Sequence, residues 1–132
     1  MKPIVPVATL LLMVLSACAP PAPKVRGADL FARHCTSCHG RGGAGGGPQA
    51  TDLAVPPANL KLLSERNGGV FPFEDVIVQV HGYTGRSAFG MMPEFGREMS
   101  GPMVDYVAAS GEVIPTPQGL IDLARYLESI QQ

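Results

Sequence analysis

Apolar residues recur at helical spacing near both ends of the chain. Gly27, Phe31 and Cys35 are four residues apart, which places them on one face of a helix predicted over about residues 28–37. A second helix is predicted over residues 117–131, and its apolar stripe consists of Leu120, Leu123, Ala124, Leu127 and Ile130. A glycine on the first face allows another helix to approach closely, so we expect these two helices to pair.

Two short helices are predicted between them. Residues 73–80 have a helical apolar pattern, and Asn59 is a suitable cap for a helix that runs through residue 66. The glycines expected to end these helices are Gly82 for the first and Gly68 or Gly69 for the second. The middle of the chain therefore continues the helical pattern set by its ends.

A small hairpin is predicted just before the last helix. The strand-like runs 104–107 and 112–114 flank a turn, so residues 103–116 are expected to form the hairpin. At its end, Thr116 is the expected N-cap of the last helix and Pro117 its first residue.

The first 17 residues have the pattern of a secretory signal. One positive charge, Lys2, precedes an apolar run of roughly fifteen residues, which is shorter than the about 20 that a membrane-spanning helix requires. The segment ends in Leu15-Ser16-Ala17-Cys18, which resembles the lipobox of bacterial lipoproteins. This resemblance implies cleavage before Cys18, a diacylglyceryl thioether on its sulfur and an acylated amino terminus. An ordinary cleaved signal, with Cys18 merely near the cut, is the alternative.

Residues 18–26 link this segment to the predicted domain. Proline occupies three of the five positions from 19 to 23, which favours extended polyproline II backbone at about 3.1 Å per residue. We therefore expect a semi-rigid tether of roughly 20 Å between the lipid and the domain. A terminus with no role is the alternative.

Composition limits both the core and the class of partner. A chain of 132 residues suits one small domain, and five phenylalanines, three tyrosines and no tryptophan predict a modest protein-only core. A net charge of −1 with both signs interspersed excludes a polybasic binder of nucleic acid or of a membrane surface. Three cysteines are an odd number, so a framework of disulfides would leave one thiol over.

The motif Cys35-x-x-Cys38-His39 carries the strongest chemical signal. Its spacing is that of covalent c-type haem attachment, in which two thiols bond to porphyrin vinyl groups and the imidazole faces the iron. A thioredoxin-like pair shares the C-x-x-C spacing but requires a βαβ frame, and no strand-like run precedes Cys35. A zinc site requires four ligands, and Cys18 on the tether is a poor fourth. The motif therefore predicts one haem c on Cys35 and Cys38, with His39 as an iron ligand.

A methionine is the expected second iron ligand. Met92 precedes a proline in the glycine-flanked loop 90–96, and the proline favours extended backbone and a fixed approach of the thioether. Met91 is the near alternative, and His81 and His34 are weaker candidates. A His–Met pair favours ferrous iron relative to two imidazoles. The methionines that follow this loop are expected to pack in the core, and they are Met99 and Met103.

Together these residues resemble the monohaem class I c-type cytochrome domain, from about residue 27 to 132. The landmarks occur in family order and are Gly27, Phe31, Cys35-x-x-Cys38-His39-Gly40, Met92-Pro93-x-Phe95-Gly96 and Leu123-x-x-Tyr126-Leu127. The resemblance implies an all-α fold of three to five helices around one covalent haem, with terminal helices crossing at Gly27, Phe31 and Tyr126. It also implies electron transfer through a partly exposed porphyrin edge. The hairpin is an addition to the compact family pattern.

Residues 40–47 are a second departure from that pattern, with six glycines in eight positions. Two interpretations stay open: a flexible loop, or backbone that passes close over the haem on the His39 side. Pro48, Pro56 and Pro57 each offer a carbonyl environment that could accept the Nδ1 hydrogen of His39 and fix its ring. The sequence does not select among the three.

The predicted function is single-electron transfer by a membrane-anchored monohaem cytochrome c that is not an enzyme. The alternatives are a haem sensor that binds a small ligand at iron, and a fixed c-type subunit of a larger oxidoreductase with the hairpin as a docking element. The expected partners are redox proteins and the membrane, not nucleic acid. The signal and lipobox imply the periplasmic side of a bacterial membrane. Because Ala19 stands where inner-membrane lipoproteins of Gram-negative bacteria have aspartate, the outer membrane is compatible with the resemblance as well.

Overall fold

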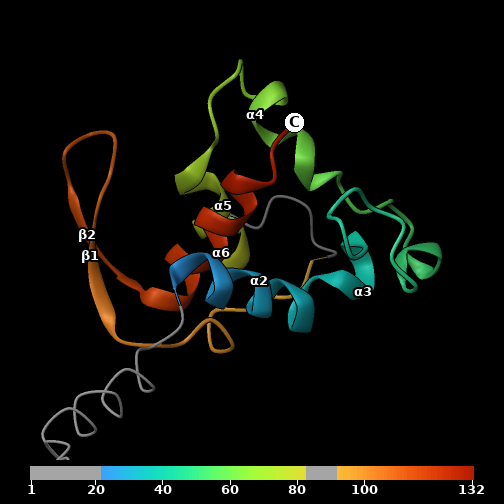
Figure 1. Ribbon diagram of the computed structural model, residues 1–132, viewed down its shortest axis with the longest axis horizontal. Coiled ribbons are helices and arrows are strands. Elements are labelled where there is room, and N and C mark those ends of the chain that lie inside the picture. The colour runs from blue at the N-terminus through green and yellow to red at the C-terminus, as the bar shows by residue number, and fades with distance from the viewer. Residues whose placement is uncertain (1–21, 83–91) are drawn as a thin grey trace, which may run out of the picture.

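The computed structural model describes residues 22–82 and 92–132, and most of the regular structure in these ranges is helical (Figure 1). The elements in chain order are α2 (Pro23–His34), α3 (Thr36–His39), the 3-10 turns η2 (Ala50–Asp52) and η3 (Leu60–Leu62), α4 (Leu63–Arg66), α5 (Phe73–His81), β1 (Met103–Val107), β2 (Val113–Pro117) and α6 (Gln118–Ser129). These helices and the small hairpin agree with the predicted fold class. None of the helices in the described ranges is long and apolar enough to cross a bilayer.

Helix α2 begins earlier than the sequence predicts. Pro23 occupies its first turn, and the carbonyl of Ala22 accepts the backbone N–H groups of Val25 and Arg26 at 2.9 and 3.1 Å. The prediction of an extended tether is therefore wrong for residues 23–26. Proline is compatible with a first helical turn because its fixed φ suits the helix and its missing N–H would have no partner there.

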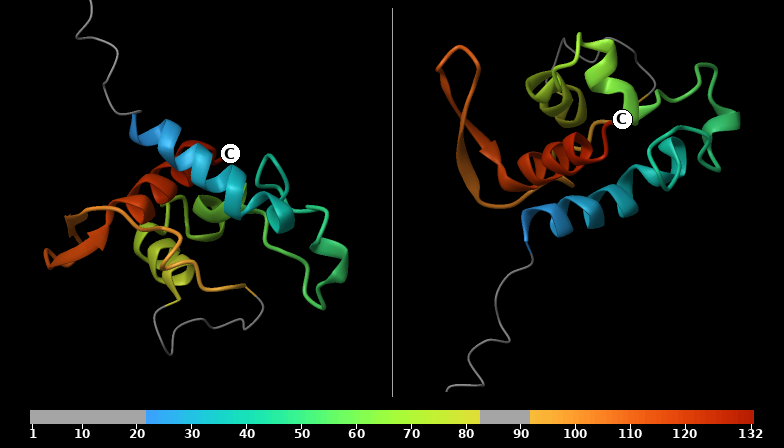
Figure 2. Two further views of the ribbon diagram at one scale, coloured as in Figure 1. Left: turned by 90° about the horizontal axis from the view of Figure 1, so that it is seen from below. Right: turned by 45° about the horizontal axis from the view of Figure 1, so that its top comes forward.

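The predicted pairing of the terminal helices is confirmed, since α2 packs against α6 and the two helices are neighbours in both views of Figure 2. Gly27 allows this approach, because a Cβ atom there would clash with the backbone carbonyl of Asp122 and lie 2.7 Å from the Cβ of Tyr126. One turn further along, the rings of Phe31 and Tyr126 lie 5.4 Å apart between centroids. The crossing thus uses the three residues expected from the family resemblance.

An ion pair with a buried carboxylate at the same crossing was not expected from the sequence. Asp122 is 1% exposed, and its Oδ2 atom accepts a hydrogen bond of 2.6 Å from Nε of Arg26. Nε2 of Gln118 donates to the other carboxylate oxygen at 2.8 Å. A buried charge is tolerated when it is paired and hydrogen-bonded, so this aspartate belongs to the helix contact and not to a reactive site.

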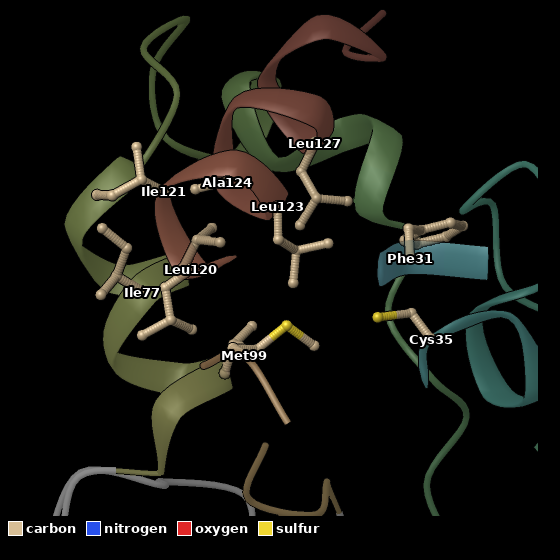
Figure 3. Close-up of a cluster of buried hydrophobic side chains, with 11 residues drawn as sticks. Phe31, Cys35, Ile77, Met99, Leu120, Ile121, Leu123, Ala124 and Leu127 are labelled. Atoms are coloured by element: carbon tan, nitrogen blue, oxygen red, sulfur yellow. The ribbon is translucent and has the colours of Figure 1, made fainter. Parts of the chain in front are cut away.

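The core lies where α5 and the C-terminal helix α6 meet near the end of α2 (Figure 3). Met99 is fully buried there, which confirms that it packs, as predicted. Its thioether points toward the side of the cluster where Cys35 lies (Figure 3). The other buried members of the cluster are Phe31, Val76, Ile77, Val80, Leu120, Ile121, Leu123, Ala124 and Leu127.

Strands β1 and β2 form the predicted hairpin, with Val107 opposite Val113 and Met103 opposite Pro117. The expectation that Thr116 caps the last helix is wrong, because Thr116 pairs within the hairpin and its hydroxyl donates to the carbonyl of Ile114 at 3.0 Å. Pro117 takes the N-cap position, where it makes no side-chain cap. Met103 does not pack in the core as predicted, since it is 59% exposed.

The two shorter helices end largely as predicted. The side chain of Asn59 accepts the backbone N–H of Lys61 at 3.0 Å and caps η3, which continues into α4 through Arg66. Helix α5 ends at Gly82, whose φ of 77° lies in the left-handed region that favours glycine.

Candidate cofactor site

One tight turn brings the two motif cysteines and the histidine together. Cys35 is the residue between α2 and α3, and its carbonyl accepts the backbone N–H groups of Cys38 at 3.3 Å and His39 at 2.9 Å. Cys35 is buried, Cys38 is half-buried, and neither forms a disulfide. Two thiols and an imidazole are thus presented by one turn at the end of α2.

The ring of His39 is held by the carbonyl of Ala58, with 2.9 Å between Nδ1 and the carbonyl oxygen. None of the three prolines considered from the sequence supplies this group; the acceptor belongs to the residue that follows Pro57. A carbonyl only accepts, so Nδ1 carries the ring proton and the lone pair lies on Nε2. This tautomer leaves Nε2 as a metal ligand.

The two thiols do not have the character of a redox pair. Burial, and to a lesser degree the neighbouring Cys38, raises the pKa of the Cys35 thiol to about 12. Reactive C-x-x-C pairs instead lower the pKa of one thiol and follow a β-strand. Here helix α2 leads into Cys35, and the described residues before it contain no strand. The structure therefore does not support the thioredoxin-like alternative.

Met92 lies in a segment that is tied to the end of α5. Its half-buried side chain packs against the core cluster that contains Cys35. Three residues later, the backbone N–H of Phe95 donates to the carbonyl of Val80 at 2.9 Å. The rival Met91 lies outside the described residues. Met92 thus presents a thioether from a segment that is bonded to the end of α5 and packed against the core cluster.

The two histidines weighed against Met92 lie in packing contacts. His34 stands next to the ring of Phe95, with centroids 6.1 Å apart. The ring of His81 packs under Gly96, where a Cβ would come within 3.1 Å of its Nε2. Both histidines therefore flank the segment that follows Met92, and these contacts help to place it.

The donor set fits one class of cofactor. Two unpaired thiols at C-x-x-C spacing, an imidazole with Nε2 available and a thioether are the groups that hold a covalently attached haem with His and Met ligands. The fold and this donor set together define a c-type haem protein.

The chain belongs to the cytochrome c family, since the family model described as "Cytochrome c" matches residues 25–131. Members of this family bind haem c covalently and are in general electron carriers, not enzymes. A search of curated proteins and a search of solved structures each found no match.

Sequence reasoning missed Ala58 and Asp122. Ala58 acts through its backbone carbonyl, so its side chain gives no signal, although a carbonyl partner for His39 was expected nearby.

The signal segment, Cys18 and the lipobox lie outside the described residues, so lipidation stays a prediction.

Proposed function

We propose that the protein is a membrane-anchored monohaem cytochrome c that transfers single electrons on the periplasmic side of a bacterial membrane. The observation that carries the proposal is the turn Cys35–His39, in which both thiols are unpaired and the Nδ1 atom of His39 is bonded to the Ala58 carbonyl. Redox proteins are the expected partners, and no enzymatic step is proposed.

Each site residue has one task in this proposal. Cys35 and Cys38 would hold the porphyrin through thioether bonds, and His39 and Met92 would be the iron ligands. Bound haem supplies the one-electron couple. The carbonyl of Ala58 orients the imidazole, and the contact of Phe95 with Val80 anchors the segment of Met92. Ligands that are fixed by the fold in this way need little rearrangement when one electron enters or leaves.

The start of α2 supports a short connection between the lipid and the domain. Cys18 stands five positions before Pro23, and a chain of that length spans at most about 17 Å. Several acyl chains on one residue provide stable anchoring, since each buried CH₂ contributes about 0.8 kcal/mol. A lipidated Cys18 would therefore hold the N-terminal end of α2 close to the bilayer.

The sharpest test compares the absorption spectra of three holoproteins made with haem-maturation machinery: the wild type, Met92→Ala and Met103→Ala. We expect a covalent haem stain and a low-spin Met-ligated spectrum for the wild type. That spectrum should be lost in Met92→Ala and kept in Met103→Ala, because Met103 is exposed on the hairpin. The spectrum of Met91→Ala tests the near alternative: loss of the Met-ligated spectrum in this variant, and not in Met92→Ala, would identify Met91 as the ligand. A negative haem stain or a high-spin wild type would contradict the proposal, and the high-spin result would favour the sensor.

Anchoring is tested separately from haem binding. The full chain and its Cys18→Ser variant are expressed in a bacterium, and the mass of each mature protein and its partition into detergent are measured. We expect the wild type to carry acyl mass and to enter the detergent phase, and Cys18→Ser to do neither. An unmodified wild-type cysteine would contradict anchoring. The proposed electron transfer would then belong to a carrier without a lipid anchor.

A specific observation favours a second candidate, a fixed c-type subunit of a larger oxidoreductase. Three apolar residues on the outer face of the hairpin are exposed to solvent: Met103 is 59% exposed, Val107 61% and Val113 54%. Asp105 lies on the same face, and apolar side chains grouped on an exposed surface in this way are typical of a contact with another protein. Co-purification with other subunits after mild solubilisation would support this candidate, whereas a purified protein without them would support the free carrier.

A further inference from the structure

The glycine-rich segment folds back onto the cysteine–histidine turn. The backbone N–H of Gly45 donates to the carbonyl of His39 at 2.9 Å, and that of Gly47 donates to the carbonyl of Cys38 at 3.0 Å. The next bond in this series joins the N–H of Gln49 to the carbonyl of Ser37 at 2.8 Å. Every second residue of the segment therefore satisfies one of the carbonyls at the end of α3, which a helix leaves without internal partners.

Close packing at these bonds explains a glycine at position 47. A Cβ atom there would clash with the carbonyl oxygen of Ser37 and lie 2.6 Å from that of Thr36. Gly47 is buried, whereas Gly42 in the same segment is exposed and has open space where its Cβ would be. Neither glycine has a positive φ, so the two positions differ in contact and not in backbone strain.

The same segment also contacts residues 57–60, which include the acceptor for the His39 ring. The carbonyl of Gly43 accepts the backbone N–H of Leu60 at 2.7 Å. A Cβ at Gly45 would lie 3.3 Å from the carbonyl oxygen of Pro57, which precedes Ala58. The segment therefore contacts both sides of the hydrogen bond between the His39 ring and the Ala58 carbonyl.

We propose that residues 43–47 act as a glycine clamp that positions the His39 imidazole through its main chain and through the Ala58 carbonyl. This deepens the proposed function, because it rests on His39 as an iron ligand. The residues of the clamp act through the His39 main chain and the Ala58 carbonyl, so they are positioning residues. Of the two interpretations from the sequence, a freely flexible loop is not what the structure shows, because the segment is bonded to the turn along its length.

Loosening the clamp has a consequence of defined sign. A well-aligned Nδ1–H···O bond makes the imidazole more basic, and a more basic ligand stabilises ferric iron. Displacement of the turn or of Ala58 weakens that bond, so the midpoint potential rises. We expect the ferric-to-ferrous equilibrium constant to change by about tenfold, which corresponds to about 59 mV for a one-electron couple.

The first experiment compares Gly47→Ala with Gly42→Ala in the holoprotein. Two quantities are measured: the midpoint potential, and the hydrogen-exchange rate of the His39 Nδ1 proton by NMR of the ferrous state. We expect both to rise in Gly47→Ala and neither to change in Gly42→Ala. A purely structural role would lower the melting temperature of Gly47→Ala while both quantities stay at their wild-type values, and that result would overturn the proposal.

A second pair decides the question if Gly47→Ala yields no holoprotein. Gly45 and Gly46 have φ values of 95° and 69°, so alanine strains the backbone at both positions, but only at Gly45 would a Cβ meet the chain before Ala58. We expect a larger rise in potential and in Nδ1 exchange for Gly45→Ala than for Gly46→Ala; equal effects would contradict the clamp. Failure of His39 as a ligand would appear differently, as a wild-type spectrum without histidine ligation.

Discussion

The hairpin leads directly into α6, yet the hairpin and the crossing of α6 with α2 are held in opposite ways. At the crossing, Gly27 leaves no room for a side chain, and an ion pair joins Arg26 to the buried carboxylate of Asp122, 96 positions further along the chain. The hairpin touches the domain with one face only. On that face the ring of Tyr106 stacks on Phe73 with 5.4 Å between centroids, while the outer face of the hairpin exposes aliphatic side chains.

This difference separates residues that build the cofactor site from residues that are available to partners. Helix α2 leads directly into Cys35, so any shift at the crossing moves the cysteine–histidine turn. The outer face of the hairpin has no such connection, because its residues contact solvent and not the core. Packing within the domain accounts for the residues at the crossing. It does not account for the exposed apolar side chains on the outer face of the hairpin.

The largest effect is expected from Gly27→Leu. The added side chain would collide with the backbone of α6, which cannot yield without a shift of the helix, so we expect the free energy of unfolding to fall by about 3 kcal/mol or more. Chemical denaturation of the holoprotein measures the loss. The control is Gly42→Leu at an open position, where we expect little change. Equal losses in the two variants would show that the crossing does not depend on close approach.

The ion pair at the crossing is expected to respond asymmetrically. Arg26→Gln leaves the Asp122 carboxylate buried without its cation, so we expect a loss of about 2–3 kcal/mol. Asp122→Asn should cost only about 1 kcal/mol, because the Arg26 side chain is 31% exposed and stays hydrated. Denaturation of both single variants and the double variant measures the coupling. A larger loss of unfolding free energy in Asp122→Asn than in Arg26→Gln would contradict this account of the crossing.

How much of this was visible in the sequence depends on how local each feature is. The apolar stripe of α6, the Asn59 cap and the hairpin follow from spacing and turn residues within a few positions, and the structure agrees with them. The cysteine–histidine turn is also local, because one motif contains all three groups. These features required no knowledge of distant contacts.

The features that the sequence did not predict depend on contacts between distant segments. Helix α2 reaches back to Pro23, where Arg26 finds Asp122 on α6, and a proline-rich pattern cannot show that partner. Thr116 is the exception, because its alternatives were local: it was expected both at the end of the hairpin and as a helix cap, and it pairs with Val104 in the hairpin. Ala58 supplies a main-chain carbonyl, which any residue has. For α2 and for Ala58, contacts with distant segments decided the outcome.

A smaller effect is expected where the hairpin meets α5. Glu74 accepts the backbone N–H of Ala109 at 2.7 Å and lies 3.5 Å from the hydroxyl of Tyr106. Since the Ala109 N–H can bond to water instead, Glu74→Ala should lower the free energy of unfolding by about 1 kcal/mol or less. Thermal denaturation measures this loss, and a loss as large as that of Gly27→Leu would show that the hairpin is part of the core.

The same contact gives the hairpin a dependence on pH. Partial burial, followed by the charge of Glu74 and its hydrogen bond, raises the pKa of Tyr106 above its ordinary value of 10.0. A raised pKa means that the folded state favours the neutral phenol, so this contribution to stability is complete below pH 10 and is lost as the pH rises through the folded pKa. NMR titration of the Tyr106 ring checks this. Glu74→Gln should lower the pKa toward 10, and an unchanged pKa would contradict the contact.

The smallest effect on stability is expected on the outer face of the hairpin, where Val107→Thr replaces a methyl group with a hydroxyl that faces water. We expect the free energy of unfolding to change by less than about 0.5 kcal/mol. The matched control is Val76→Thr in the core of α5, where a buried hydroxyl should cost about 1–2 kcal/mol. If Val107→Thr leaves stability unchanged but releases the protein from co-purifying subunits, the outer face is a protein contact. If it destabilises the protein as much as Val76→Thr does, the face belongs to the fold, and the contrast with the helix crossing is lost.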